Sequence, residues 1–581
     1  MDRDAAYTVD SRPADTDPNR RRAVPAVLAL VAVFGSLPAA AQHLRPAAPG
    51  PIAPRMGPTF RSSADVTRLL EQSTFGPTDA LIKRVQRMGM RSYLDQQFAL
   101  KVSSYPDFSG VPNDSSVGCP TGSASTCIRD NYTLYPLQVR FFQNALKNDD
   151  QLRQRVALAL HEILVVSGVR LPRPSQMAPY LNMLLGNAFE NYRKILYDLT
   201  RNPAMGRYLD MVNNDAPTPN SNVAPNENYA REVLQLFSIG VDLLHPDGTP
   251  QLDGSGDPIP AYTQDNVEDF AHVFTGWTYA PLPGAKSVRH NPPNYSAPMV
   301  LFRDATGKDV NHDKGPKLLL DYPRPVNATI AANQDGEQEL NDAIDNIFHH
   351  PNVGPFIGRQ LIQHLVTSNP SPAYVARVSA VFDNNGRRVR GDMKAVIRAI
   401  LLDPEARGAV RTEPDYGHLR EPVLFITGLL RALGASSDAI LASQANNMGQ
   451  NLFYPATVFS YFPYDFEIAG SDDDGPEFGI LTSLSALRRV NFVNTLVFSK
   501  FTSPAPDPGT VADLSPLAKL ATDPAGLVES LNQVLLHGAM SPEMRTTVTD
   551  TVAAIPATNL LLRAQTALYL VASSSQYQVE R

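Results

Sequence analysis

Arg155-Val-Ala-Leu-Ala-Leu-His161-Glu162-Ile-Leu-Val-Val166 is an apolar run that contains one ionisable pair, His161 and Glu162. Between Arg155 and Arg170 no other side chain can carry a charge. A helix that is apolar on all sides is buried in the protein core. Burying a charge is costly unless it is paired, so we expect other polar groups to face His161 and Glu162.

A second polar helix is expected about sixty-five residues further on, over Glu227-Asn228-Tyr-Ala-Arg231-Glu232. Glu227 and Arg231, and likewise Asn228 and Glu232, are four residues apart and lie one turn apart on the same helix face. One interpretation is a buried ion-pair network that holds helices together. The other places Glu232 or Glu227 opposite His161, where carboxylates in different environments can divide acid and base roles.

Most of the remaining chain shows apolar residues at helical spacing, which predicts a mainly α fold. We expect one large multi-helix domain with long irregular loops, at 280–330 and 503–514, and a small β-hairpin at 242–254 with Asp-Gly turns. The expected helices include 340–348, 357–365, 372–382, 389–402, 419–433, 480–498, 515–536, 541–553 and 558–573.

The N-terminal segment resembles an export signal. Arg20-Arg21-Arg22 precedes an apolar stretch over 24–37, and Ala39-Ala40-Ala41 fits a small-residue cleavage site. A membrane anchor is the alternative, but Pro38 and the alanines make the apolar run shorter than the roughly 20 residues that a span needs. We therefore expect a signal peptide at 1–41 and an exported protein, whether periplasmic, on the cell surface or secreted.

After cleavage, a Pro- and Ala-rich linker is expected over 42–60, followed by a single large helical domain over 61–581 whose C-terminal helical part spans about 510–581. The chain has two cysteines, Cys119 and Cys127, in a polar loop with no histidine nearby. In an exported protein this pair predicts a disulfide rather than a zinc site or free thiols.

Composition and motifs exclude several function classes. A net charge of −7, with no basic stripe, is not the pattern of a nucleic-acid-binding protein. No segment after the signal has the length of a membrane span. The chain has no Gly-x-Ser-x-Gly, Gly-x-Gly-x-x-Gly or Gly-x-x-x-x-Gly-Lys motif. The zinc-protease pattern His-Glu-x-x-His also fails, because Val165 stands at the second histidine position.

Several segments together resemble a bacterial family, the domain of unknown function 1800. The resemblance covers roughly residues 60 to 581. The segments that carry it are Leu70-Glu-Gln-Ser-Thr-Phe-Gly-Pro77, Asn226-Glu-Asn-Tyr-Ala-Arg-Glu232 and its continuation to Gly240, Val273-Phe-Thr-Gly-Trp277, His312-Asp313-Lys-Gly-Pro-Lys317, His350-Pro-Asn-Val-Gly-Pro-Phe-Ile-Gly-Arg359, Arg420-Glu421-Pro422 and 567–578.

The resemblance implies an exported, mainly helical protein and assigns no activity. Members are often encoded beside a second exported family, the domain of unknown function 1501, which is similar to sulfatases. One branch carries Trp-His-Asn-His-Phe where this chain has Leu160-His161-Glu162-Ile163-Leu164. His161 matches the first histidine of that motif, but Ile163 replaces the second, so a shared two-histidine metal site is not implied.

Two further segments supply candidate site residues. His312, Asp313 and Lys317 lie in the long loop, where polar side chains over a rigid body are candidates for a site. The alternative is turn chemistry, in which Asp313 bonds its own backbone. Trp277, the single tryptophan, is either a core anchor or a stacking surface for a sugar ring.

Two functions follow from these residues. The first is an exported hydrolase or lyase acting on envelope or extracellular polymer, such as a polysaccharide. The second is a non-catalytic envelope binding or scaffold protein that partners a sulfatase-like exported protein. The sequence assigns no cofactor or metal. In the first function the catalytic residues are His161, Glu162, Glu227, Arg231, Glu232, His312 and Asp313, and the binding residues are Asn228, Trp277 and Lys317.

Overall fold

The computed structural model describes residues 63–581 except 219–223, 409–412, 414–415 and 504–508. The described residues belong to one compact unit. The expected signal peptide and the whole of the expected linker lie outside the described residues.

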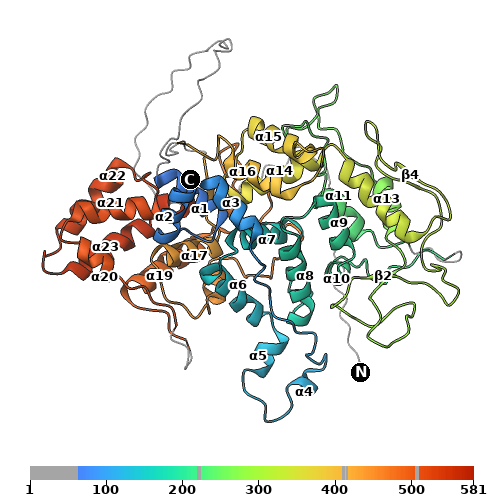
Figure 1. Cartoon of the computed structure of the whole chain (residues 1–581), viewed down its shortest axis with the longest axis horizontal. Helices are drawn as coiled ribbons and strands as arrows, with labels where there is room; N and C mark the ends of the chain where they lie inside the picture. The colour runs from blue at the N-terminus through green and yellow to red at the C-terminus, as the bar shows by residue number, and fades with distance from the viewer. Residues whose placement is uncertain (1–62, 219–223, 409–412, 414–415, 504–508) are drawn as a thin grey trace, which may run out of the picture. The chain divides into compact units, whose positions relative to one another are not determined.

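The described residues form 24 α-helices, one 3-10 helix and six short strands, so the fold is mainly α as expected (Figure 1). The helices are α1 (Ser63–Ser73), α2 (Asp79–Met88), α3 (Met90–Ala99), α4 (Ser115–Gly118), α5 (Cys127–Tyr132), α6 (Tyr135–Lys147), α7 (Gln151–Ile163), α8 (Pro174–Asn187), α9 (Tyr192–Thr200), α10 (Pro203–Tyr208), α11 (Asn228–Gln235), α12 (Gln264–Val273), α13 (Gly336–His349), α14 (Val353–Leu365), α15 (Pro372–Asp383), α16 (Met393–Leu402), α17 (Pro422–Ala432), α18 (Ala442–Asn447), η1 (3-10, Pro476–Ile480), α19 (Ser483–Phe498), α20 (Ser515–Leu520), α21 (Pro524–Leu535), α22 (Pro542–Ala553), α23 (Leu560–Ala572) and α24 (Ser575–Gln578).

Helix α7 forms the centre of the core. All 13 of its residues are buried, as the apolar run predicts. It packs against α3, α6, α8 and α14, and Figure 1 shows it among these helices. A helix buried on every side fixes the positions of its polar side chains, because each must find a partner among the surrounding helices.

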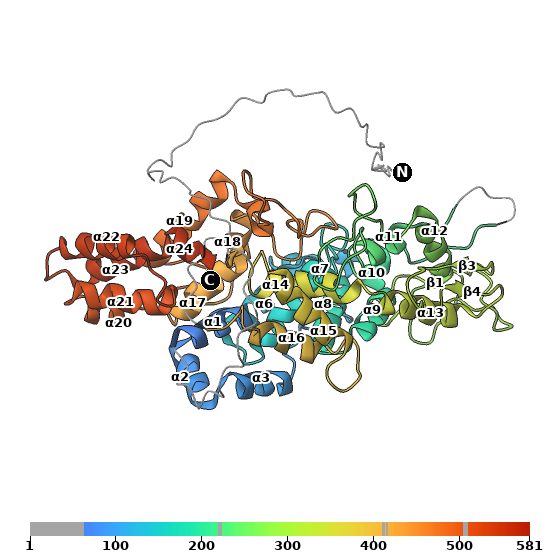
Figure 2. The same cartoon turned by 90° about the horizontal axis from the view of Figure 1, so that it is seen from above.

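The C-terminal helices α20 to α23 pack against one another and lie together in Figure 2. The helix expected over 515–536 is in fact two helices, α20 and α21, and this part of the prediction is wrong. The break falls before Pro524, which has no backbone N–H and disfavours helical backbone in the residue before it. Likewise, the helix expected from residue 480 begins at Ser483, after η1.

Strands are few and short among the described residues. They are β1 (Trp277–Thr278), β2 (Val300–Leu301), β3 (Lys317–Leu318), β4 (Thr329–Ile330), β5 (His418–Leu419) and β6 (Val579–Glu580). They form three antiparallel pairs, β1–β2, β3–β4 and β5–β6. The expected hairpin appears as isolated antiparallel bridges that extend to Pro260.

Cys119 and Cys127 form the expected disulfide, with their Cα atoms 5.9 Å apart. Across the described ranges, no helix combines the length and apolarity that crossing a membrane requires.

Candidate functional site

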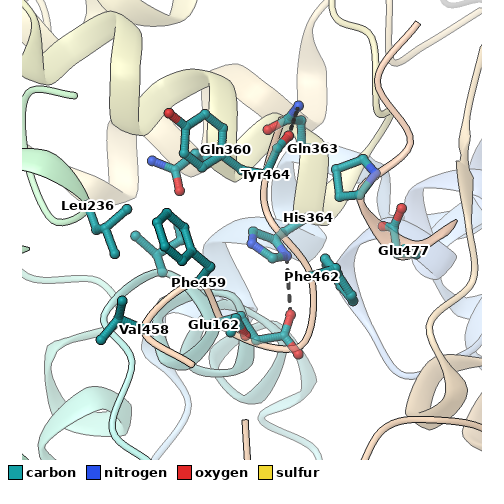
Figure 3. A pocket seen from close by; sticks show the side chains of 13 residues that line it. Glu162, Leu236, Gln360, Gln363, His364, Val458, Phe459, Phe462, Tyr464 and Glu477 are labelled. Atoms are coloured by element: carbon teal, nitrogen blue, oxygen red, sulfur yellow. Dashed lines mark hydrogen bonds and ion pairs between the residues drawn. The ribbon is translucent and has the colours of Figure 1, made fainter. Parts of the chain in front are cut away.

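A pocket opens beside the C-terminal end of α7. It holds about 480 Å³ of empty space, which includes open solvent, and has room for only a few water molecules. Figure 3 shows Glu162 from α7, His364 from α14 and Glu477 from η1 lining it. The other wall residues are Ile163, Leu236, Gln360, Gln363, Val458, Phe459, Ser460, Phe462, Tyr464 and Pro476.

Glu162 is the centre of the polar network behind this pocket. Its Oε2 lies 3.3 Å from His364 Nδ1, and its Oε1 accepts a hydrogen bond of 3.1 Å from Gln450 Nε2. Gln450 Nε2 also donates to Glu421 Oε2, and Glu421 is hydrogen-bonded to Glu162. The two carboxyl groups therefore lie in contact at the base of the site.

Two carboxyl groups this close and this deeply buried share a proton. Burial raises the pKa of Glu162 to about 7. Burial, followed by the neighbouring charge of Glu162, raises the pKa of Glu421 well above its usual range. At neutral pH Glu421 is thus the protonated partner and donates its hydrogen bond to Glu162.

His364 is neutral at physiological pH, because burial lowers its pKa to about 4. With Glu162 as the acceptor, Nδ1 carries the ring proton, which leaves Nε2 as the basic nitrogen. Nε2 has no hydrogen-bond partner among the described residues, and the side chain keeps 16% of its surface exposed. The arrangement is a carboxylate that orients a neutral imidazole whose free nitrogen is open to the pocket.

Four buried polar atoms of the pocket wall have no hydrogen-bond partner within the described parts of the chain. They are Gln360 Nε2, Gln363 Oε1, Ser460 Oγ and Glu477 Oε2. Ser460 also holds a left-handed backbone with φ of 67°, which is strained for a residue with a side chain. Buried polar groups are normally paired, so these atoms indicate a place for water or a polar ligand.

A second layer holds Glu477 in the wall. His418 Nδ1 lies 2.9 Å from Glu477 Oε1, and His418 Nε2 lies 3.7 Å from Glu580 Oε2. Burial alone would lower the pKa of His418, but the two carboxylates outweigh it and raise that pKa to about 10. A charged imidazolium therefore ties strand β6 to the pocket wall through β5.

His161 points away from this pocket, although it precedes Glu162 in the sequence. Adjacent residues on a helix point about 100° apart. The ring packs against Phe453, and its Nδ1 lies 3.4 Å from Tyr180 Oη. Burial lowers the pKa of His161 to about 4, so the ring is a neutral core side chain.

The polar residues of α11 lie elsewhere. Glu227 accepts a hydrogen bond of 2.5 Å from Arg231, and both side chains are about one-third exposed. Asn228 is exposed and donates its backbone N–H to Asn226 Oδ1. Glu232 is more deeply placed: burial raises its pKa to about 7, and its Oε2 has no hydrogen-bond partner in the described chain.

The loop residues form a third cluster. His312 Nε2 and Lys317 Nζ lie 3.0 Å and 2.7 Å from the same oxygen, Oε2 of the fully buried Glu339. Asp313 pairs with His272 at 3.0 Å, which holds the pKa of Asp313 far below its usual range. Trp277 has 1% of its surface exposed and lies in the core.

The structure thus separates the sequence-predicted residues. Within the described ranges, no hydrogen bond or ion pair joins His161 to Glu232 or to His312. Of the candidates, Glu162 lines the pocket. The sequence analysis missed His364, Glu421 and Glu477, and the one available signal was Arg420-Glu421-Pro422, a charged pair before a helix-starting proline. The described His, Cys, Asp and Glu side chains form no group that could hold a metal ion.

Residues 68–579 match a family described as "Protein of unknown function (DUF1800)". No curated protein and no solved structure matches the chain.

Proposed function

We propose that this chain, which belongs to the family of unknown function DUF1800, is an exported hydrolase or lyase that acts on an envelope or extracellular polymer. The observation that carries the proposal is the pairing of His364 with Glu162 at the base of a pocket lined by unpaired polar atoms. The disulfide between Cys119 and Cys127 and the signal-like N-terminal sequence support export, because disulfides persist in oxidising compartments.

In this proposal His364 is the general base. Its free Nε2 accepts a proton from a group in the pocket, and the Glu162 carboxylate stabilises the imidazolium that forms. If the proton comes from a water molecule, the resulting hydroxide attacks a scissile bond and the reaction is a hydrolysis. If it comes from a substrate carbon, a leaving group departs and the reaction is an elimination.

The small size of the pocket favours hydrolysis, because it has room for a few water molecules but not for a sugar ring. After the bond breaks, the His364 imidazolium returns its proton to the leaving group, which restores the neutral imidazole. The protonated Glu421 stays behind Glu162 and holds that carboxylate in place through the shared hydrogen bond.

The test uses His364→Gln and Glu162→Gln, with Glu227→Gln as a matched control at a surface carboxyl. Purified protein is incubated with a panel of polysaccharides, and both new reducing ends and unsaturated products are measured. We expect His364→Gln to lower the rate about 100-fold or more, the usual contribution of a general base, with an unchanged fold by circular dichroism. The control should retain full activity.

An active His364→Gln variant would refute the assigned base. Binding to a polymer without turnover, or capture of a sulfatase-like exported protein, would instead favour the non-catalytic scaffold. Fractionation of the source cells tests export, since the protein should lie in the periplasm, on the surface or in the medium.

A further inference from the structure

A broad groove lies on another part of the molecule, between α3, α15 and α16. It encloses about 1160 Å³ of open space. Figures 1 and 2 both show α3 beside α16, so the groove brings together a segment near residue 90 and a segment near residue 390.

The groove is rich in positive charge although the whole chain carries −7. Two carboxylates, Asp392 and Asp403, also line it. Its cationic lining residues are Arg91, Arg377, Arg387, Lys394 and Arg398.

Both carboxylates accept hydrogen bonds from other groups of the protein. Asp403 accepts two hydrogen bonds of 2.8 Å from Arg377. Asp392 caps α16 by accepting from the backbone N–H of Ala395, and it also accepts from Asn385. Arg377 neutralises Asp403, whereas Asp392 keeps its charge because both of its partners are neutral. The five cations of the groove still outnumber its two carboxylates.

Three of these cations face solvent and form no ion pair with a described carboxylate. Arg398 pairs with Asp95 at 2.5 Å, but Arg91, Arg387 and Lys394 form no ion pair with any described residue and are exposed. Clustering of like charges destabilises a surface, so their position together suggests a use outside folding.

The loop that carries Arg387 is held in shape by its own side chains. Asn384 Oδ1 accepts from the backbone N–H of Gly386 and Arg388, and Asn385 Oδ1 accepts from Arg387. Arg390 anchors the loop by donating to the carbonyl of Phe348. The guanidinium of Arg387 is therefore presented from an ordered loop, which lowers the entropy lost on binding.

We propose that this groove binds a segment of an acidic polysaccharide, with its carboxylate or sulfate groups paired to Arg91, Arg387 and Lys394. Guanidinium groups bind such planar or tetrahedral anions through paired hydrogen bonds. The groove is open and far larger than a single anion, which fits a chain. Its described lining contains no aromatic side chain, so it lacks the stacking surface with which proteins hold single-stranded nucleic acid.

This inference concerns binding and does not depend on the chemistry proposed for the His364 pocket. Loss of polymer binding would leave the acid–base centre untouched, and an inactive His364→Gln variant should still bind. The two proposals can therefore fail separately.

The experiment measures binding of the full chain to polygalacturonate and to dextran sulfate, with neutral dextran as the uncharged control. The test variant is Arg91→Gln/Arg387→Gln/Lys394→Gln. The matched control removes three exposed cations outside the groove, Lys286→Gln/Lys308→Gln/Lys519→Gln, and has the same net charge.

We expect the groove variant to bind at least one of the acidic polymers about tenfold or more weakly, with a shallower dependence of affinity on salt, while the control variant binds like the wild type. Equal loss in both variants would mean that only net charge matters and would overturn the proposal. Equal binding of neutral dextran, displacement of the polymer by inorganic sulfate at the same anion concentration, or tight binding of oligothymidylate would also overturn it. So would unchanged binding by the groove variant.

Discussion

Replacing Glu162 by Gln should remove the contribution of this carboxyl group to the pH dependence of stability between pH 4.5 and 8. In the unfolded chain the carboxyl ionises near pH 4.5, whereas in the folded protein burial holds its pKa near 7. The folded state thus binds the proton more tightly, so stability is lost as pH rises through this window. This difference in the pKa of Glu162 between the two states corresponds to a loss of about 3 kcal/mol in the free energy of unfolding. The loss is complete above pH 7.

The variant lacks this ionisation but keeps an oxygen that can accept from His364. Its free energy of unfolding relative to the wild type should therefore rise by about 3 kcal/mol between pH 4.5 and pH 8. Urea unfolding at several pH values, followed by the fluorescence of Trp277, measures the difference. Glu227→Gln is the control, because Arg231 and Gln264 lower the pKa of that carboxyl out of this window.

Parallel pH profiles for the wild type and Glu162→Gln would refute the argument. They would mean that Glu162 ionises near its ordinary pKa, and that no proton is held between it and Glu421.

Three other outcomes are expected from the same urea assay. Lys317→Met should destabilise the protein by about 3–5 kcal/mol, because it leaves the buried Glu339 carboxylate without its cation, and adding Glu339→Gln should recover part of the loss. His418→Gln should lower the free energy of unfolding most below pH 6.5 and progressively less as pH rises toward 10, because the raised pKa makes the imidazolium the stabilising form. A loss of stability that does not change with pH would contradict this. Reducing Cys119–Cys127 should lower the free energy of unfolding by up to about 3 kcal/mol, and an unchanged midpoint would argue against any contribution from the disulfide.

Local sequence patterns predicted the helices well, because a helix forms between residues that are close in the sequence. The apolar run around His161 and Glu162 predicted a helix buried on every side, and α7 is buried throughout. The cysteine pair was also predictable, since both residues lie in one loop. The helix break before Pro524 was within reach of the same rules but was missed.

The partners of Glu162 were not predictable in this way. The sequence predicted only that polar groups would face it, and the structure brings a neutral histidine from α14 and a second carboxyl group from the start of α17. Nothing in the sequence near His364 or Glu421 marks them as neighbours of residue 162, because helix packing alone brings them together. The free energy cost of burying an acid falls if the acid keeps its proton, and it also falls if the acid pairs with a cation. The charged residues of the sequence do not show which of the two happens.

The pairing of β5 with β6 suggests that two separate fragments of the chain would still associate into the same fold. Beyond the strand pair, Arg420 donates to the carbonyl of Tyr577, and Arg489 bridges the Arg420 carbonyl and Gln578 Oε1. Two polypeptides separated between residues 503 and 509 would share these buried contacts as well as the packing of α19 on α23. The two co-expressed fragments should therefore reassemble, which would make this protein a scaffold for fragment-complementation reporters.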